Sequence, residues 1–493
     1  MSRFKTLVRT GAFLAFFALG SSSLATAQTP TADLDGLSPA KQAVLEAVDE
    51  LAGEIHDMSM TLWEFAETAL LESRSAAFLA DLLEGEGFTV ERGVADMPTA
   101  FVATYARGEG GPTIGVLAEY DALPGVGNDP VPGRAARADG VSSGQGCGHN
   151  LFGAGSVGAA IALKRAMERE NLTGTLRLYG TPAEETVVGK VYMAKAGLFD
   201  DLDAALEWHP GLETEVRNQP GRALNNFTVE FRGQAAHASA DPWNGRSALD
   251  AVELMNYGVN LMREHVRPTA RIHYVIPSAG EAPNVVPEYA KVWYYVRDTA
   301  RVTVEAYYDR ILKIAEGAAI ATRTEHEAFL ITGVHETLLN RPLQEATQAN
   351  LDLVGAPRFP DAFQSFATEM QSGLGISQDG LDTEIRPLAD GPMPPEGGST
   401  DVAEVSYITP TVGFSVTSAP AGVPWHSWAT TAAHGTEWAV RAADVAARVL
   451  ALTGVDLLTD PELVRSAREF WAEERAGEPY RSPIPLDQKP PLP

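Results

Sequence analysis

The spacing of apolar and polar residues along the chain predicts a body of the α/β class. Runs of consecutive apolar residues, which are typical of strands buried on both faces, occupy residues 175–179, 204–208 and 411–416. Each run ends in a turn that carries polar side chains. We therefore predict one α/β body, formed by residues 38–222 together with residues 334–480.

The segment between these two parts, residues 223–333, has a different pattern and is predicted to be an inserted domain. Its first strand alternates apolar and polar residues, and its two helices have amphipathic spacing. The order of elements is βαββαβ, which is that of a ferredoxin-like split unit, with a hairpin turn at 280–284. The predicted elements are strand 226–231, helix 247–265, strands 271–276 and 290–296, helix 302–321 and strand 326–332.

Composition agrees with a large folded protein and excludes some partners. The chain has 493 residues, of which 45% are hydrophobic and 21% charged, so it can bury a large core in two or more domains. It carries 38 Lys and Arg against 65 Asp and Glu, a net charge of −27. A field of this sign repels nucleic acid and anionic membranes, so we expect neither as a partner.

The first 27 residues are predicted to be a secretory signal peptide. Basic residues precede the apolar stretch 11–20, and Ala25-Thr26-Ala27 fits a cleavage site. The stretch is shorter than the roughly 20 residues that span a bilayer, and no cysteine near the cut could carry a lipid. We expect a periplasmic or secreted protein without a membrane anchor after cleavage. The Pro-rich tail, residues 481–493, is expected to be irregular.

The only cysteine of the chain, Cys147, lies in the motif Gly146-Cys147-Gly148-His149-Asn150. A single thiol in an exported protein has no partner for a disulfide, which favours a metal ligand or a nucleophile. The alternative is a small buried apolar residue, since free cysteines are commonly buried.

Three further segments bring polar side chains to the ends of predicted strands. Glu184-Glu185 follows strand 175–179, His209 follows 204–208, and His426 follows 411–416. Open α/β sheets bind their ligands at such strand exits. Each of these residues alone could be an ordinary solvated side chain. Together with Cys147 they offer thiolate, imidazole and carboxylate, the donors that bind zinc and other first-row metals.

Five motifs follow one another along the chain: Asp121-Ala122-Leu123-Pro124, Cys147-Gly148-His149, Glu184-Glu185, His209 and His426-Ser427. In this order they resemble the motifs of the co-catalytic metallopeptidases, which include aminoacylases, glutamate carboxypeptidases and auxin-conjugate amidohydrolases. The likeness is greatest to the amidohydrolase branch that contains the aminobenzoyl-glutamate hydrolases. The resemblance covers nearly the whole mature chain and implies an α/β/α catalytic domain, with helices in two layers, and a ferredoxin-like lid and dimerisation domain. Asn150 and Glu119 stand where relatives commonly have Asp.

The resemblance also implies roles at the metal site. Cys147 lies between two ions, Glu184 is the general base, and Asp121 orients an imidazole. His434 is the alternative for the last ligand, ranked second because residues 430–442 are predicted to begin a helix. Two divalent ions per chain, Zn²⁺ or Mn²⁺ with Co²⁺ also possible, are expected to bind to Cys147, His149, Glu185, His209 and His426.

Residues of the inserted domain are implied to complete the site. In relatives the counterpart of His237 reaches across a dimer to the partner's active site, although a solvated loop histidine is the alternative here. Asn284 and Arg297 match residues that hold the substrate and its carboxylate, which a guanidinium binds bidentately. For Arg297 the alternative is an ion pair with Asp298 or another exposed acid. A backbone cradle for substrate is expected at Gly398 and Ser399.

These observations predict a dimeric metal-dependent amidohydrolase that cleaves N-acyl or N-aroyl amino acids, with aminobenzoyl-glutamate-like conjugates favoured. A dipeptidase or carboxypeptidase of the same family is the first alternative. A cysteine hydrolase with Cys147 as nucleophile and His149 as base is disfavoured, because two residues on a tight turn align poorly for proton transfer and Glu184-Glu185 would be idle. A non-enzymatic periplasmic binding protein would not need Glu184.

Overall fold

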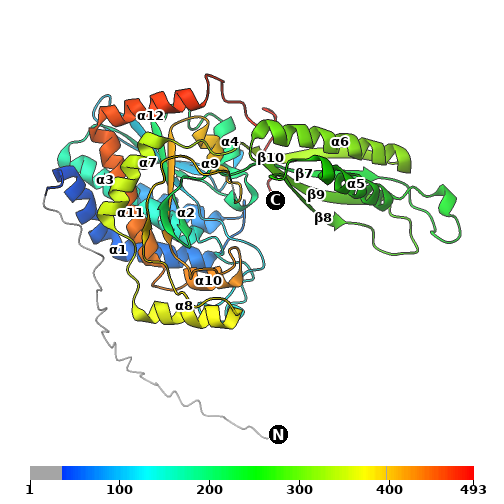
Figure 1. The fold of residues 1–493 in the computed structure, drawn as a ribbon, viewed down its shortest axis with the longest axis horizontal. Coiled ribbons are helices and arrows are strands. Elements are labelled where there is room, and N and C mark those ends of the chain that lie inside the picture. Colours follow the sequence, from blue (N-terminus) through cyan, green and yellow to red (C-terminus); the bar gives the residue numbers. More distant parts are fainter. Residues whose placement is uncertain (1–35, 396) are drawn as a thin grey trace, which may run out of the picture.

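The computed structural model describes residues 36–395 and 397–493, so the predicted signal peptide lies outside the described residues. Two separate sheets are present, one of eight strands in the body and one of four strands in the inserted segment. In Figure 1 the smaller sheet and its two helices project from one side of the body. Among the described residues, no helix is both long enough and apolar enough to cross a membrane.

The body sheet has the order β1-β2-β4-β3-β5-β12-β6-β11, and its central strands β4, β3, β5 and β12 are parallel. The predicted strands 175–179, 204–208 and 411–416 correspond to β4, β5 and β12, although β5 continues through His209. The bounds are β1 (Thr89–Arg92), β2 (Phe101–Arg107), β3 (Thr113–Ala118), β4 (Gly174–Gly180), β5 (Ala204–Gly211), β6 (Thr214–Val216), β11 (Ile385–Arg386) and β12 (Thr411–Thr417).

Helices cover both faces of this sheet, which confirms the predicted α/β/α class. Leu206 and Trp208 of β5 join the larger core beneath α1, α3 and α11, whereas Ala205 joins a second core beneath α4 and α9. The bounds are α1 (Pro39–Phe65), α2 (Ser73–Gly85), α3 (His149–Glu170), α4 (Gly189–Lys195), α7 (Arg341–Val354), α8 (Asp361–Leu374), α9 (Val402–Ser406), α10 (Trp428–His434), α11 (Val440–Thr459) and α12 (Pro461–Glu474), with 3-10 turns η1 (Val94–Asp96) and η2 (Glu184–Thr186).

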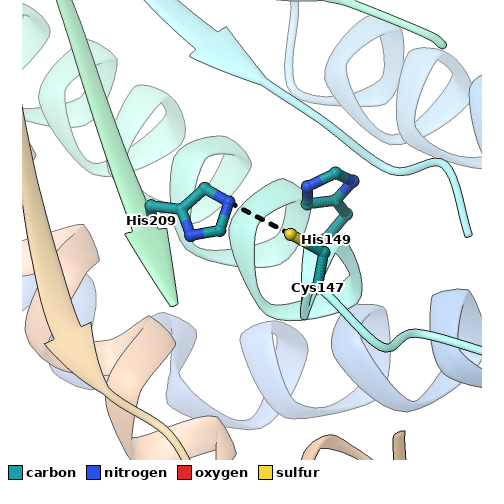
Figure 2. Close-up of side chains that lie close together, drawn as sticks. All are labelled: Cys147, His149 and His209. Carbon is teal, nitrogen blue, oxygen red and sulfur yellow. Dashed lines mark hydrogen bonds between the residues drawn. The ribbon is translucent and has the colours of Figure 1, made fainter. Parts of the chain in front are cut away.

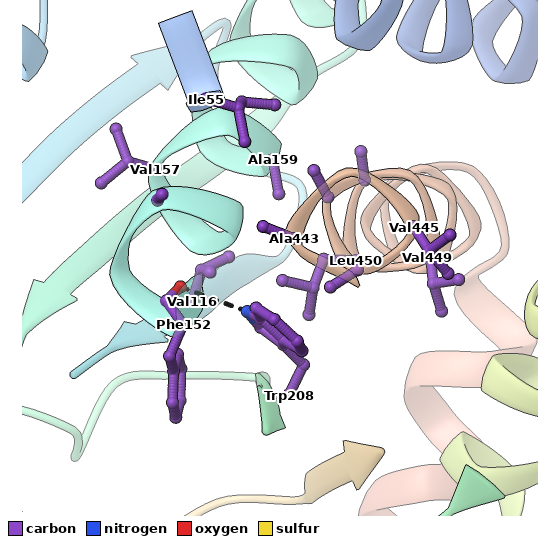
Figure 3. Close-up of a cluster of buried hydrophobic side chains, with 14 of the residues drawn as sticks. Ile55, Val116, Phe152, Val157, Ala159, Trp208, Ala443, Val445, Val449 and Leu450 are labelled. Carbon is purple, nitrogen blue, oxygen red and sulfur yellow. Dashed lines mark hydrogen bonds between the residues drawn. The ribbon is translucent and has the colours of Figure 1, made fainter. Parts of the chain in front are cut away.

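Helix α3 packs tightly on the sheet because its inward face is made of small residues. A Cβ at Gly155 would lie 3.0 Å from the indole of Trp208, so a larger residue there would push the helix outward. The same indole donates a hydrogen bond to Phe152 O at 3.2 Å. Figure 3 shows Trp208 beneath α3 and beside α11. This packing fixes the position of the N-terminus of α3, where Cys147 and His149 lie.

The lid, which we define as residues 223–334, has the predicted element order βαββαβ. Its antiparallel sheet has the order β10-β7-β9-β8, and α5 and α6 share a separate apolar core with it. The bounds are β7 (Ala223–Arg232), α5 (Ala248–Met262), β8 (Arg271–Ser278), β9 (Tyr289–Asp298), α6 (Arg301–Thr322) and β10 (Glu325–Val334), with 3-10 turns η3 (Pro242–Asn244) and η4 (Arg263–His265).

The C-terminal tail lies where the lid leaves the body (Figure 1). As predicted, residues 481–493 form neither helix nor strand. Gln488 Nε2 donates to Tyr192 Oη and to Leu330 O, both at 2.8 Å, so the tail bridges α4 and β10.

A buried acid stabilises the same junction. Glu404 accepts hydrogen bonds from the His335 backbone N–H at 2.7 Å and from Tyr480 Oη at 2.6 Å, and its carboxylate lies 2.8 Å from His335 Nδ1. Burial by itself would raise the pKa of Glu404, but His335 and Tyr480 lower that pKa below its ordinary value. An ionised carboxylate therefore links the end of β10, α9 and the tail.

Candidate metal centre

The N-terminus of α3 carries Cys147 and His149 into the body, and Gly148 makes this possible. Gly148 has φ +84°, a left-handed conformation that glycine adopts without strain. A Cβ there would lie 2.8 Å from Pro210 and 2.9 Å from the ring of His434. The glycine thus allows the loop to pass between these side chains and to present the thiol beside β5.

Two imidazoles from distant segments face the Cys147 thiol. Cys147 Sγ lies 3.4 Å from Nε2 of His209, at the end of β5, and 3.3 Å from Nε2 of His426, in the loop after β12. Trp425 Nε1 donates to the same sulfur at 3.4 Å. Figure 2 shows His209 and His149 on either side of the sulfur. The structure therefore brings these predicted ligands together around one thiol.

His149 is oriented by the carboxylate that follows β3. Its Nδ1 lies 2.9 Å from Asp121 Oδ1, and Asp121 Oδ2 accepts a hydrogen bond from the backbone N–H of Glu185 at 2.9 Å. All three groups are buried or nearly so. One carboxylate thus fixes both the imidazole and the glutamate turn, and it leaves His149 Nε2 free to face the site.

The turn η2 places Glu184 and Glu185 in different groups of donors. Glu185 Oε2 lies 3.5 Å from His426 Nε2 and belongs to a group of donors with Cys147 and His426. Glu184 instead belongs to a group with Glu119 and His149.

The donors fit divalent metal ions. Two groups, Cys147 with His149 and His209, and Cys147 with Glu185 and His426, have donor atoms within 4.8 Å of one another. Separations of about 3.0–3.5 Å are what two ligands of one ion show when metal–ligand bonds are ~2.0–2.3 Å long. The buried Oε1 of Glu185 has no hydrogen-bond partner among the described residues. A buried carboxylate oxygen without such a partner is what a metal ligand would show.

The electrostatics of the site also favour bound cations. Burial is the main cause that raises the pKa of Glu185 to about 8, and it raises the pKa of the Cys147 thiol as well. Burial lowers the pKa of His209, and it lowers that of His426 to about 4, with His149 contributing. The two imidazoles are therefore neutral at pH 7, as metal ligands must be.

His434, the alternative for the last ligand, has another role. Its Nδ1 lies 2.9 Å from Gln145 O and its Nε2 lies 3.0 Å from Ser418 Oγ. It is the last residue of α10 and is fully buried. These contacts occupy both ring nitrogens, so His434 holds the loop before Cys147, and His426 faces the thiol.

Arg297 lies at the end of β9 that is nearest to the body. Its Nε is buried without a hydrogen-bond partner among the described residues, and so is Ser399 Oγ. A Cβ at Gly398 would lie 3.9 Å from Arg297 Nη1, so the guanidinium and the predicted cradle are adjacent. Asp298, the alternative partner, accepts from Thr269 Oγ1 at 2.6 Å.

His237 and Asn284 lie at the opposite end of the lid. Ala238 N donates to Asn284 O at 3.0 Å, and both predicted site residues are exposed. The ten residues of β9 separate this end from Arg297, a length of roughly 30 Å at ~3.3 Å per residue. Within one chain, the structure does not bring His237 or Asn284 to the metal donors.

A buried ionic cluster beside the donors was not predicted from the sequence. Lys190 Nζ lies 2.7 Å from Glu119 Oε1 and 2.6 Å from Asp401 Oδ1, and all three side chains are at most 1% exposed. Two features of the sequence could have indicated this cluster. Glu119 directly follows the apolar run 114–118, and Lys190 lies among apolar residues in a helix.

The fold and its donor groups describe an α/β protein able to hold metal ions, and the comparisons identify it as a hydrolytic enzyme that acts on amide bonds. Residues 115–285 match peptidase family M20/M25/M40. Over 462 residues the chain is 36% identical to the B subunit of p-aminobenzoyl-glutamate hydrolase of Escherichia coli, and the match covers 88% of this chain and 95% of that protein. The chain therefore belongs to this peptidase family. The family resemblance found in the sequence is confirmed, and so is the prediction of an enzyme that hydrolyses amide bonds.

A further relative and two solved structures are also similar to this chain. The Xaa-Arg dipeptidase of Mus musculus is 29% identical over 466 residues, 90% of this chain and 94% of that protein. A putative aminohydrolase from Staphylococcus aureus has a TM-score of 0.60 at 19% identity, over 85% of this chain and all of that chain. A dinuclear metal-binding peptidase from Bacillus subtilis has a TM-score of 0.54 at 19% identity, over 83% of this chain and 99% of that chain. These two structures share the fold.

Proposed function

We propose that this enzyme is a two-metal amidohydrolase that cleaves N-acyl or N-aroyl amino acids, with aminobenzoyl-glutamate-like conjugates favoured. The observation that carries the proposal is that two groups of metal donors share Cys147. The name of the 36% identical relative, one of the two subunits of an aminobenzoyl-glutamate hydrolase, supports the substrate class.

In this proposal two groups of donors that share Cys147 would hold divalent ions. Cys147 would do so with His149 and His209 in one group and with Glu185 and His426 in the other. Zinc suits the thiolate and imidazole donors, and Mn²⁺ or Co²⁺ suits a site that also offers carboxylates. Such ions polarise an amide carbonyl and lower the pKa of water toward ~7.

Glu184 is the general base in this proposal. Its neighbour Glu185 is directed to the donors around Cys147, whereas Glu184 is buried beside them. Burial, followed by the nearby acids Glu119 and Asp401, raises the pKa of Glu184 well above its ordinary value. A carboxylate with a raised pKa takes a proton from the attacking water and passes it to the leaving amine. Asp121 keeps His149 in position for the ions.

Arg297 binds the free carboxylate of the amino-acid half of the substrate. Arg297 is half-buried, its buried Nε–H has no hydrogen-bond partner among the described residues, and its Nη1 lies near Gly398. A buried donor without a partner is costly, so an anionic group of the substrate would be favoured there. The second candidate function is a dipeptidase, because a dipeptide has the same carboxylate and a 29% identical relative is an Xaa-Arg dipeptidase.

Two further parts of the proposal concern assembly and location. We propose a homodimer in which the far end of the lid brings His237 to the partner's site, because within one chain the length of β9, roughly 30 Å at ~3.3 Å per residue, separates the His237 end of the lid from Arg297. The relative is named as one of two different subunits, which makes a heteromeric assembly the alternative. The signal-like pattern of residues 1–27 supports export to the periplasm or medium.

The test is a hydrolysis screen of the metal-reconstituted protein. N-acyl amino acids, aroyl-glutamates and Xaa-Arg dipeptides are compared, with release of the free amine as the readout. Glu184→Gln should keep its metal and lose ~10²–10⁴-fold in rate, as general bases do. Glu207→Gln is the matched control, because Glu207 is a buried glutamate of β5 that pairs with Arg217 and belongs to none of the donor groups. Full turnover by metal-loaded Glu184→Gln would refute the assignment.

A further inference from the structure

Glu119 has an unusual position for a buried carboxylate. It follows β3, its side chain is 1% exposed, and its two oxygens face different partners. Oε1 accepts from Lys190 Nζ at 2.7 Å. Oε2 lies 3.1 Å from His149 Nε2, yet neither of these two atoms has a hydrogen-bond partner among the described residues.

The distance between Glu119 and His149 fits two ligands of one ion better than it fits a hydrogen bond. The two atoms are close enough to bond, but the geometry is not that of a hydrogen bond. When two atoms bind the same ion, the lone pair of each atom is directed at the ion and not at the other atom. With metal–ligand bonds of ~2.0–2.2 Å and angles of 90–109°, the ligand atoms are ~2.9–3.5 Å apart. Glu119, His149 and Glu184 also form a donor group of their own.

The surroundings hold Glu119 in this orientation. Lys190 Nζ is bound between Glu119 Oε1 and Asp401 Oδ1, and the backbone N–H of Lys190 donates to Asp401 Oδ2 at 2.8 Å. Lys190 lies in α4 and Asp401 precedes α9, so two helices fix the pair. Buried metal-binding carboxylates are commonly oriented by such hydrogen bonds to the oxygen that does not bind the metal.

We propose that Glu119 is a metal ligand in this chain, in addition to the five donors above, and that Lys190 positions it. The inference rests on the proposed metal centre. Glu119 would add an anionic oxygen beside His149, in the donor group that it forms with His149 and Glu184. Oxygen donors favour Mn²⁺, whereas the affinity for Zn²⁺ depends more on thiolate and imidazole. Glu119 therefore sets the metal preference of this site.

The experiment compares the wild type with Glu119→Gln after removal and reloading of metal. The readouts are the number of ions per chain, the Kd values for Mn²⁺ and Zn²⁺ by chelator competition, and the visible spectrum of the Co²⁺-loaded protein. We expect Glu119→Gln to weaken Mn²⁺ binding by ~100-fold or more and Zn²⁺ binding by ~10-fold or less, with an altered Co²⁺ spectrum. Glu207→Gln is the control for loss of a buried carboxylate and should match the wild type.

A second variant separates loss of a metal ligand from misfolding caused by an unbalanced buried charge. Glu119→Gln leaves Lys190 with one counter-ion fewer, so the double variant Glu119→Gln/Lys190→Met, which keeps the buried charge balanced, should show the same loss of Mn²⁺ affinity. Wild-type Kd values and spectrum in both variants would overturn the inference and leave the proposed metal centre intact. A wild-type chain that binds neither ion would overturn the metal centre itself, and this inference with it.

Discussion

Replacement of Asp121 by asparagine tests how the metal centre is organised. Asp121 is completely buried and accepts from two donors, the imidazole of His149 and the backbone N–H of Glu185. Burial would raise its pKa, but His149 and the Glu185 N–H lower the pKa overall, so the group is an anion. Asp121→Asn keeps the shape of the side chain and removes its charge. It also replaces one carboxylate oxygen by an amide nitrogen, which can donate a hydrogen bond but cannot accept one.

The expected loss follows from these contacts. In Asp121→Asn, the amide NH₂ must face one of the two donors, so either Glu185 loses its acceptor or His149 retains only the Asp121 backbone oxygen, 3.1 Å from Nδ1. Loss of one hydrogen bond to a buried charged group costs about 1.5–3 kcal/mol. Because about 1.4 kcal/mol corresponds to a factor of ten, metal affinity should fall by ~10–150-fold. Loss of the residue that hydrogen-bonds to a metal-binding histidine typically lowers metal affinity by ~10–100-fold, which agrees with this expected decrease.

The assay is a chelator competition for Zn²⁺ and Mn²⁺, at equal helical content by circular dichroism. Asp203→Asn is the matched control, because Asp203 also accepts a backbone N–H, from Thr113 at 2.7 Å, at the opposite end of the sheet. That variant should bind metal as the wild type does. Wild-type affinity in Asp121→Asn would refute the view that Asp121 organises the ligands.

Four more outcomes are expected. Cys147→Ser should lose bound metal together with activity, whereas a variant that lacks only a nucleophile would retain its metal. Arg297→Lys should raise KM at least ~10-fold for substrates with a free carboxylate, and should leave their amides unaffected. Mixed subunits of inactive Glu184→Gln and inactive His237→Ala should regain activity, because one composite site has both intact residues; no recovery after verified exchange would refute action across a dimer. The lowered pKa of Glu404 means that its stabilising effect is complete above its ordinary pKa of 4.5 and disappears as the pH falls through the lowered value. The difference in urea stability between the wild type and Glu404→Gln should therefore decrease below pH 4.5.

The parts of the fold that were predictable have short-range signals. Apolar runs identified β4, β5 and β12, and alternation with amphipathic spacing identified the order of elements in the lid. The exits of parallel strands lie at one edge of the sheet, so the convergence of His209 and His426 on Cys147 followed from local patterns.

The unpredicted parts depend on contacts between distant segments. Lys190 and Asp401 are 211 positions apart, and nothing in either local sequence indicates that they pair. Glu119 was noted only as a departure from a motif, because the second partner of its carboxylate lies on α4. The bridge of the tail between α4 and β10 likewise depends on Gln488, a polar residue in a Pro-rich segment that has no periodicity.

The balance of buried charge links these observations. Glu119, Asp121, Glu184, Glu185 and Asp401 are buried at the strand exits, and Lys190 is the cation paired with two of them. Ionised carboxylates at this density repel one another, which is why nearby acids contribute to the raised pKa values of Glu184 and Glu185. Protonation would relieve the repulsion but would remove the base. The two divalent ions of the proposed centre would relieve it and leave the carboxylates ionised, so an arrangement that is costly without cations would be suited to hydrolysis with them.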